Sequence, residues 1–232
     1  MAGKRTHGSI FLSTKQLLVL ASSSPRRREL LSIAGFMFNT VKVDVDESPL
    51  PDEEPCPYVL RLSHSKAQAA AKLVEGAPHK PLILAADTTV ADNGEILGKP
   101  PNAEAAEQVL KQLRGRTHQV HTAVTVLNTE TGQLEQEVAS TDVPMRHYSD
   151  EEIAAYIETG DPFDKAGGYA IQHPDFRPVE TRTGCYANVV GLPLCHLLKI
   201  LRRMEIPVTQ DIPFLCQSAH EYECGVFSSI LR

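Results

Sequence analysis

The 232-residue chain has no tryptophan and only five cysteines, none of which lies in a C-x-x-C pair. Structural zinc sites and disulfide-stapled secreted domains usually need cysteines at regular, paired spacings, so neither class fits this sequence. We therefore expect reduced thiols in a cytoplasmic protein. A disulfide between Cys216 and Cys224, near the end of the chain, is the alternative that this spacing leaves open.

Long apolar runs and several common motifs are also missing. No apolar stretch approaches the roughly 20 residues of a membrane-spanning helix, and no apolar signal segment follows Lys4 and Arg5, so we expect neither membrane insertion nor secretion. The sequence contains no G-x-x-x-x-G-K-[ST], G-x-G-x-x-G, G-x-S-x-G or H-E-x-x-H. These absences argue against P-loop and Rossmann sites, an esterase nucleophile elbow and a zinc protease.

The charge balance is acidic, with a formal net charge of −6 at pH 7, and 42% of the residues are hydrophobic. Excess negative charge argues against wholesale nucleic-acid binding but is compatible with a local basic pocket. The length and apolar content suit a globular protein with an ample core, built as one large domain or two small ones.

The stretch Leu18–Leu31, LVLASSSPRRRELL, combines a short apolar strand, three hydroxyls and the start of a helix. Ser24 is a good N-cap and Pro25 suits the first helical position. Three arginines then lie in the first turn, where the helix dipole disfavours positive charge. A bound phosphate would explain them, because backbone N–H groups and guanidiniums would converge on it. The simpler alternative is a capped surface helix with solvated arginines.

Two acidic residues follow apolar segments. Residues 81–86 predict a central buried strand that ends at Asp87, and residues 36–45 predict a second strand that leads to Asp46 and Glu47. Open α/β sheets usually bind ligands at the carboxyl ends of their strands. Asp87 and Glu47 could therefore hold Mg²⁺ or Mn²⁺ against phosphate oxygens. Asp46 competes with Glu47 for that role, and a turn residue and a solvated charge are the plain alternatives for Asp87 and Glu47.

Five cations lie beside strand ends or glycine-rich turns. Any one of them alone would be interpreted as a solvated surface charge, but together they indicate one anion-binding cleft. They are Arg26, Arg27, Lys66, Lys99 and Lys165.

The periodicity of apolar residues suggests the order of the remaining elements. We expect helices over residues 58–74, 103–113 and 149–160 and a last one ending near residue 204, with paired strands over residues 118–127 and 135–145. Asn102 is expected to cap the second helix, and Ser149 and Glu152 to form a capping box at the start of the third. Residues 160–172 predict a loop that enters a strand, and residues 205–232 show no firm pattern. This order predicts an α/β fold, with a mixed twisted sheet, two lobes and a cleft.

Seven blocks in this order resemble the Maf family of nucleotide pyrophosphatases. They are SSSPRRRELL, VDES, RLSHSKAQAA, AADTTV, GKP, GDPFDKAGGYAIQ and NVVGLP. The resemblance implies a Maf-like domain over residues 17–204, an N-terminal leader over 1–16 and a C-terminal tail over 205–232. It also implies a fold like that of the inosine triphosphate pyrophosphatases, with a deep cleft between two lobes. A homodimer would be consistent with the family.

The resemblance implies an enzyme that hydrolyses nucleoside triphosphates to the monophosphate and pyrophosphate with a divalent metal, Mg²⁺ or Mn²⁺. Asp87 matches the acid proposed as the catalytic proton acceptor, and Glu47 matches a second acid of the pocket. We expect both acids to hold the metal. The positions that match substrate contacts are Ser22, Ser24, Arg27, Lys66 and Lys99.

Three further positions distinguish the subfamilies, and here they are Arg26, Thr88 and Gln172. These residues are similar to those of the dTTP and UTP type, whereas the 7-methyl-GTP type has tryptophan at the first position. One departure follows Gln172, where the sequence His173–Phe176 replaces a glycine-rich turn. The alternatives are a pyrophosphatase for 7-methyl-GTP or ITP, and a regulator of cell division that binds nucleotide or nucleic acid without turnover.

Overall fold

The computed structural model describes residues 17–179, 181 and 183–232, and the leader expected at residues 1–16 lies outside them. The strands are β1 (Leu18–Leu20), β2 (Phe38–Thr40), β3 (Leu82–Asp92), β4 (Glu95–Leu97), β5 (Thr117–Asn128) and β6 (Leu134–Pro144). The helices are α1 (Pro25–Ile33), α2 (Pro55–Leu73), α3 (Ala103–Leu113), α4 (Asp150–Glu158), α5 (Tyr186–Val190), α6 (Leu194–Arg203), α7 (Ile212–His220) and α8 (Phe227–Ile230), with 3-10 turns η1 (Asp161–Asp164) and η2 (Ala166–Gly168).

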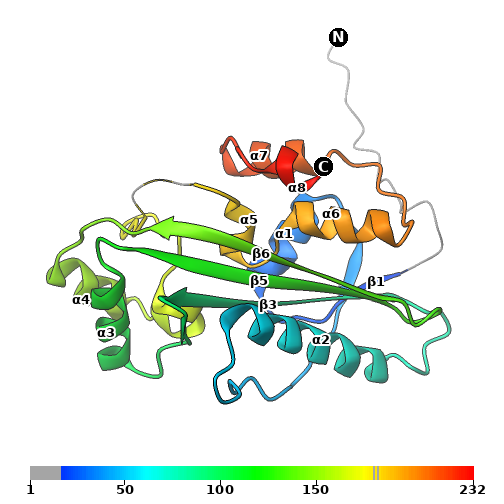
Figure 1. The fold of residues 1–232 in the computed structure, drawn as a ribbon, viewed down its shortest axis with the longest axis horizontal. Helices are drawn as coiled ribbons and strands as arrows, with labels where there is room; N and C mark the ends of the chain where they lie inside the picture. The colour runs from blue at the N-terminus through cyan, green and yellow to red at the C-terminus, as the bar shows by residue number, and fades with distance from the viewer. Residues whose placement is uncertain (1–16, 180, 182) are drawn as a thin grey trace, which may run out of the picture.

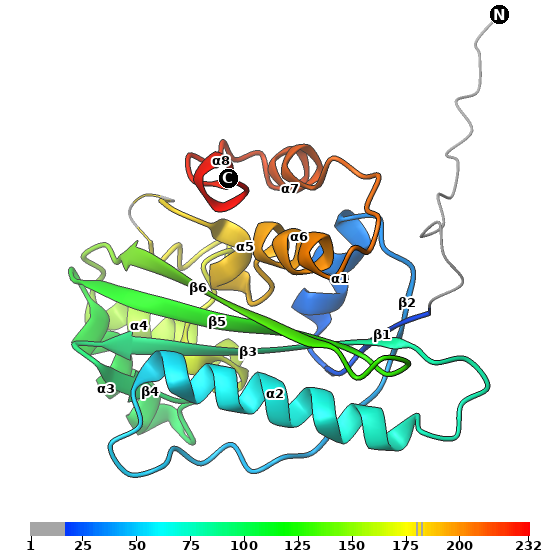
Figure 2. The same cartoon turned by 45° about the vertical axis from the view of Figure 1, so that its right-hand side comes forward.

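The expected mixed α/β sheet is confirmed, and its strand order is β2-β1-β3-β5-β6, with β4 paired to β3. The first three strands run parallel, whereas β4 and β5 are antiparallel to β3 and β6 is antiparallel to β5. Helix α2 covers one face, α1, α5 and α6 cover the other, and α3 and α4 lie at one end (Figures 1 and 2).

Strand β3 is unevenly paired along one of its edges. Strand β1 pairs with it only as far as Leu84, and β4 pairs with it only from Val90 onward. Its other edge pairs with β5 from Leu82 to Ala91. Between β1 and β4, the edge of β3 around Asp87 is therefore open, and side chains from both faces of the strand can reach the same space.

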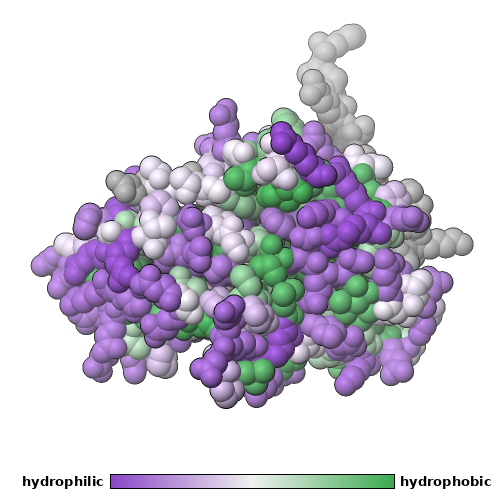
Figure 3. All heavy atoms as spheres, in the orientation of Figure 1, coloured by the Kyte–Doolittle hydropathy of each residue, from purple (hydrophilic) through white to green (hydrophobic). Residues whose placement is uncertain are grey.

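Three apolar clusters surround the sheet. One lies under α1, α5 and α6, a second lies under α2, and a third joins α3 and α4 to the far ends of β3, β5 and β6. The third cluster builds the lobe beyond the open edge of β3, which accounts for the two lobes. On the face shown in Figure 3, hydrophilic residues cover most of the surface and hydrophobic ones form small separate areas.

The helix starts follow the predicted capping residues. The Ser24 side chain accepts a hydrogen bond from the Arg27 backbone N–H at the start of α1. The Asn102 side chain accepts one from the Ala105 backbone N–H at the start of α3. Ser149 and Glu152 form the expected capping box of α4. These caps satisfy backbone donors that the first helical turn leaves free.

Several local expectations are wrong. The strand expected over residues 36–45 is only the three-residue β2, because β2 pairs with β1 alone and β1 is itself three residues long. Helix α2 begins at Pro55 instead of Tyr58, because proline, interpreted from sequence as a loop residue, also fits the first turn of a helix. Residues 160–172 do not enter a strand but form η1 and η2, since Gly160 and Gly167 adopt left-handed backbone conformations with φ of 75° and 70°. At Gly167 an added Cβ would lie 2.9 Å from the Val90 side chain, so glycine is required there.

Residues 205–232, which showed no firm pattern in the sequence, form α7 and α8. Asp211 caps α7, and Ile206 and Ile212 are buried against α1 and α6. Between these helices and the domain lies an apolar cavity of about 20 Å³. We call it the thiol pocket, because four cysteines contribute to its lining: Cys185, Cys195, Cys216 and Cys224.

All five cysteines are unpaired, so the alternative of a Cys216–Cys224 disulfide is not realised. Among the described residues, no helix combines the length and apolarity needed to cross a membrane.

Candidate functional site

A cavity of about 660 Å³ opens beside the free edge of β3, between the two lobes. Its walls come from the β1–α1 turn, the loop before α2, the middle of α2, β3, and the segment from η1 to residue 172. Apart from Asp46, the residues singled out from sequence as site candidates line it: Ser22, Ser24, Arg26, Arg27, Glu47, Lys66, Asp87, Thr88, Lys99, Lys165 and Gln172.

Asp87 lies in the middle of β3, which corrects the expectation that the strand ends at Asp87. The strand continues to Asp92 because its other edge stays paired with β5. The acid still faces a ligand site, because the neighbouring strand β1 ends at Leu20. The ligand site therefore lies at the carboxyl end of β1, the usual position in such sheets, and not at the carboxyl end of β3.

Lys66 of α2 bridges the two acids of the cavity. Its Nζ lies 2.5 Å from Asp87 Oδ1 and 2.6 Å from Glu47 Oε1. Asp87 is buried, whereas the Glu47 side chain is 47% exposed. Partial burial alone would raise the pKa of Glu47, but the Lys66 ammonium outweighs this effect and, with Lys99 and Arg27, holds that pKa below its ordinary value. Glu47 is therefore a carboxylate at neutral pH.

The two carboxylates fit a divalent metal bound together with phosphate. Mg²⁺ usually takes one or two protein carboxylates and completes its shell with water and substrate oxygens. The described residues contain no group of three or more His, Cys, Asp or Glu side chains arranged to enclose a metal. The donor set thus suits an ion that arrives with a phosphate ligand. Asp46 does not line the cavity, and its carboxylate accepts a hydrogen bond from the Ser48 N–H.

Two residues that the sequence did not single out hold the loop that carries Glu47. The Tyr58 hydroxyl donates to the Glu47 carbonyl oxygen over 2.8 Å, and Arg61 donates to the Ser48 carbonyl oxygen over 3.1 Å. Burial, together with Asp87 and Glu47, raises the pKa of Tyr58 to about 12, so its phenol stays protonated and remains a donor. Their proximity to Glu47 depends on the path of the loop, which no local pattern reveals.

The β1–α1 turn builds the cationic wall. Ser22 Oγ accepts from the Ser24 N–H, and Arg27 donates to Ser22 Oγ, to the Gly191 carbonyl and to Thr88 Oγ1. Burial lowers the pKa of Arg27, but an arginine remains charged at any physiological pH. These contacts hold the guanidinium in a fixed orientation at the wall of the cavity.

The segment from η1 to Gln172 closes the cavity from the other lobe. Arg26 reaches across to Asp164 over 3.4 Å, and the buried Lys165 contacts Asp161 and Asp164 over 2.8 and 2.5 Å. Lys99 lines the cavity from the turn after β4. These contacts bring together cations that are up to 139 positions apart, as Arg26 and Lys165 are.

The departure at His173–Phe176 forms a tight turn behind the cavity. His173 Nδ1 accepts from the Phe176 N–H, and the buried Phe176 ring stacks on Tyr156 at a centroid distance of 4.3 Å. Tyr156 in turn accepts from the Ala170 N–H, two residues before Gln172. An aromatic anchor therefore holds this rim of the cavity.

Comparison with known proteins shows the family. The family model described as "Maf-like protein" matches residues 17–204, from the first described residue to the end of α6 and the residue after it. The chain belongs to the Maf family. The match ends before α7 and α8, so these two helices lie outside the part that the family model covers.

Two curated relatives of this Maf-family chain are both named "dTTP/UTP pyrophosphatase". The protein of that name from Geobacter sp. strain M21 is 49% identical over 185 residues, which are 80% of this chain and 94% of that protein. The one from Thermomicrobium roseum is 45% identical over 204 residues, 86% of this chain and 91% of that protein. A solved structure from Vibrio cholerae is similar only at a TM-score of 0.35 and 8% identity.

Proposed function

We propose that this Maf-family chain hydrolyses dTTP and UTP to the nucleoside monophosphate and pyrophosphate with a divalent metal, Mg²⁺ or Mn²⁺. The observation that carries the proposal is the cavity that Arg27 and Asp87 share although 60 positions separate them in sequence. The cationic wall that would bind phosphate therefore lines the same cavity as the Asp87 carboxylate. Relatives that are 45 to 49% identical and named for this activity support the choice of substrate.

In this proposal Asp87 orients the attacking water at the α-phosphorus and accepts its proton. Lys66 keeps the Asp87 and Glu47 carboxylates close together before substrate arrives, since its Nζ contacts both. Glu47 and Asp87 would hold the divalent ion. When bound, that ion screens the triphosphate charge and acidifies a bound water.

The cations act on the leaving group. Negative charge builds on the bridging oxygen and the departing pyrophosphate, and fixed cations in a water-poor cavity stabilise it strongly. We assign this role to Arg27, Lys66 and Lys99, with Ser22 and Ser24 as further phosphate contacts. The Arg27 contacts to Ser22, Gly191 and Thr88 support the assignment, because a guanidinium that is already oriented needs no reorganisation when charge develops.

Base selection is assigned to Arg26, Thr88 and Gln172. Gln172 carries both a donor and an acceptor, which suits the imide edge of thymine or uracil. All three residues lie on the cavity wall, and the aromatic anchor at Phe176 steadies the segment that presents Gln172.

Cellular context and assembly complete the proposal. The unpaired cysteines suit a cytoplasmic enzyme. The net charge of −6 argues against nucleic acid as a partner. A domain over residues 17–204 carries the activity, residues 205–232 pack behind it, and two copies form a homodimer. Light scattering on the purified chain tests the last point.

Pyrophosphate release from purified protein tests the function. We expect turnover of dTTP and UTP in the presence of Mg²⁺ or Mn²⁺ and loss of turnover with EDTA. A preference for 7-methyl-GTP or ITP would refute the base selection and leave the reaction intact. Nucleotide binding without pyrophosphate release under any metal would refute the enzyme and favour a regulatory binder.

A further inference from the structure

A closed ring of hydrogen bonds lies behind the cationic wall. Arg27 Nη2 donates to Thr88 Oγ1 over 3.0 Å, and Thr88 Oγ1 lies 3.0 Å from Thr122 Oγ1. Thr122 Oγ1 donates to the Asn188 carbonyl over 3.0 Å, and that carbonyl also accepts from the Gly191 N–H. The Gly191 carbonyl accepts from Arg27 Nε over 2.8 Å, which closes the ring.

The chemistry of the members sets the direction of every proton in this ring. A carbonyl oxygen can only accept, so the single proton of Thr122 goes to Asn188. Thr122 must then accept a hydrogen bond from Thr88, which uses its only hydroxyl proton for that bond. Thr88 in turn accepts from Arg27, which can only donate. The Thr88 hydroxyl therefore has no proton left to donate to a ligand. It anchors Arg27, and toward a base it can act only as an acceptor or by packing.

Thr122, Asn188 and Gly191 are the ring members that do not line the cavity, and of these Thr122 is the one that contacts Thr88. It is fully buried on β5, pairs in register with Thr88 on β3, and is absent from the cavity lining. Registered neighbours project from the same face of a sheet, which places the two hydroxyls together. Its hydroxyl therefore connects the wall of the cavity to α5 without contacting a ligand.

The α5 end of the ring is held firmly. Asn188 is fully buried, and its side-chain amide donates to the Val120 carbonyl over 3.0 Å and to Thr141 Oγ1 over 2.9 Å. Gly191 follows with φ of 114°, and a Cβ there would lie 3.2 Å from Thr88 Oγ1 and 3.5 Å from Arg27 Nε. The turn that receives Arg27 is thus fastened to β5 and β6.

We propose that Thr122 is a positioning residue that, through Thr88, fixes the Arg27 guanidinium for the phosphate chain. The proposal rests on the proposed function and deepens it. Three of the five Arg27 N–H groups are spent on Gly191, Thr88 and Ser22. The two remaining N–H groups of Arg27 make none of these contacts, and the ring determines the direction in which they point.

Thr122→Val keeps the shape of the side chain and removes the hydroxyl. We expect kcat/KM for dTTP to fall about 10- to 100-fold, since a misplacement of about 1 Å in a reacting group can cost about 100-fold. We expect Thr122→Ser to restore most of the activity, because it supplies the same proton and acceptor. The affinity for inorganic pyrophosphate should fall in parallel in Thr122→Val, which gives a readout that needs no turnover.

Thr125→Val is the matched control. Thr125 is equally buried on the same strand but projects from the opposite face, where its hydroxyl donates to Ser63 Oγ over 2.8 Å and accepts from Gln136 Nε2. It should lower the melting temperature to a similar extent and leave kcat/KM and pyrophosphate affinity within about twofold of wild type.

A double-mutant cycle with Arg27→Lys decides whether Thr122 acts through Arg27. Lysine lacks the planar fork, so the ring has nothing left to orient. Thr122→Val should then cost less than about threefold, because coupled residues are not additive. Equal losses in both backgrounds, or full activity in Thr122→Val alone, would overturn the proposal. Should Thr122→Val fail to fold, Thr122→Ala removes the same hydroxyl and enters the same cycle.

The two proposals fail in different ways. A wild-type protein that releases no pyrophosphate from any nucleotide refutes the proposed function, while the cycle on pyrophosphate affinity still tests Thr122. An active wild type with additive variants refutes only the positioning role.

Discussion

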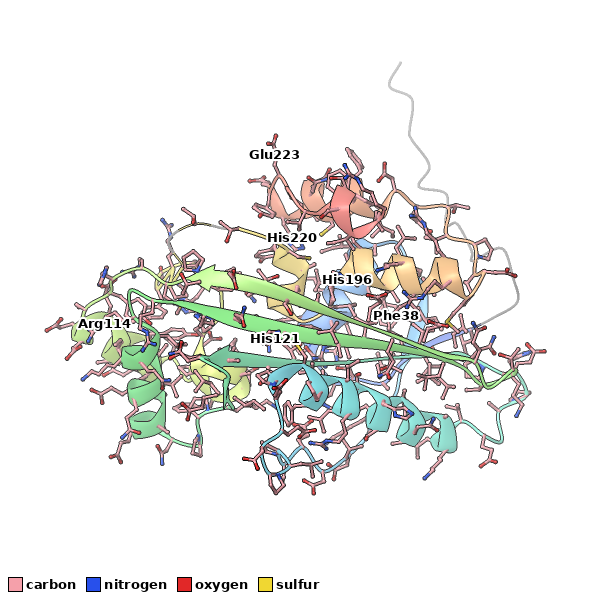
Figure 4. All side chains as sticks on the ribbon, in the orientation of Figure 1. Phe38, Arg114, His121, His196, His220 and Glu223 are labelled. Carbon is pink, nitrogen blue, oxygen red and sulfur yellow. The ribbon has the colours of Figure 1, made fainter. Side chains whose placement is uncertain are left out.

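The reaction cavity and the thiol pocket are two hollows that face the same helix, α5, and their chemistry is opposite. The cavity holds about 660 Å³ and its lining includes five cations and three carboxylates, two of which, Asp87 and Glu47, share one lysine. The thiol pocket holds about 20 Å³ and is lined mainly by cysteines, aromatic rings and aliphatic residues, with Gln217 and His220 as its other polar side chains. Figure 4 shows His220 between α7 and α5, and its ring lies 4.6 Å from that of Tyr186.

The difference shows how burial acts on ionisable groups with and without a partner. In the thiol pocket burial raises the pKa of Cys185 and Cys195 to about 12, and that of Cys216 to about 11, so these thiols stay neutral. In the cavity Lys66 offsets burial and keeps Glu47 charged. One hollow is therefore built for packing and the other for binding charge.

Asp87→Asn tests the cavity with the largest expected effect. The amide keeps the size of the side chain but can neither accept the proton of the water nor pair with Lys66, so kcat should fall about 10²- to 10⁴-fold. Pyrophosphate release measures it. Asp92→Asn is the control, because Asp92 is an equally buried acid of β3 that contacts Gln112 and Arg116 outside the cavity. Near-full activity in Asp87→Asn would refute its catalytic role.

Ile212→Ala tests the other half of the comparison, the packing of residues 205–232 around the thiol pocket. Ile212 is 1% exposed, and shortening such a side chain costs about 2–5 kcal/mol of unfolding free energy. We expect urea denaturation to show this loss and kcat to stay unchanged. Phe214→Ala, two residues along the same helix at 62% exposure, should change the unfolding free energy by less than about 0.5 kcal/mol. A loss of kcat in Ile212→Ala without loss of stability would contradict the division of roles.

Because of the cysteines in the thiol pocket, the free energy of unfolding should fall at alkaline pH. Their pKa values are higher in the folded than in the unfolded chain, so the unfolded chain binds fewer protons above its own thiol pKa of about 8.5. The stabilisation is complete below that pH and is lost as pH rises toward about 11 to 12. Urea midpoints between pH 8 and 10.5 measure the slope. Cys195→Ala should flatten it, and an unchanged slope would contradict the assignment.

Tyr58→Phe tests the cavity with the smallest effect that we expect. It removes the hydroxyl that donates to the Glu47 carbonyl, a bond worth about 0.5–1.5 kcal/mol. We expect the metal concentration for half-maximal activity to rise about two- to tenfold. Tyr148→Phe removes the same kind of bond, to the Leu110 carbonyl outside the cavity, and should leave the metal requirement as it was. Identical behaviour of the two variants would contradict the role of Tyr58.

Local sequence determined the elements and the inventory of the site. Alternation, capping residues and turn residues depend on neighbours a few positions apart, so helix α3 and its Asn102 cap were predicted at their observed bounds. The order of the seven blocks predicted the fold class and the family. The five cations and two of the three acids that meet in the cavity, Asp87 and Glu47, were also identified as candidates, because their residue types and their places beside turns carry the signal.

Only the tertiary structure decided how these residues meet. Asp87 faces the cavity because β1 stops short beside a longer strand, which depends on strand pairing across more than 60 positions. Thr122 meets Thr88, which contacts Arg27, because β3 and β5 pair in one register. The helices of residues 205–232 are held by burial of Ile206 and Ile212. Register and burial are set by contacts between segments distant in sequence, so no local pattern contains them.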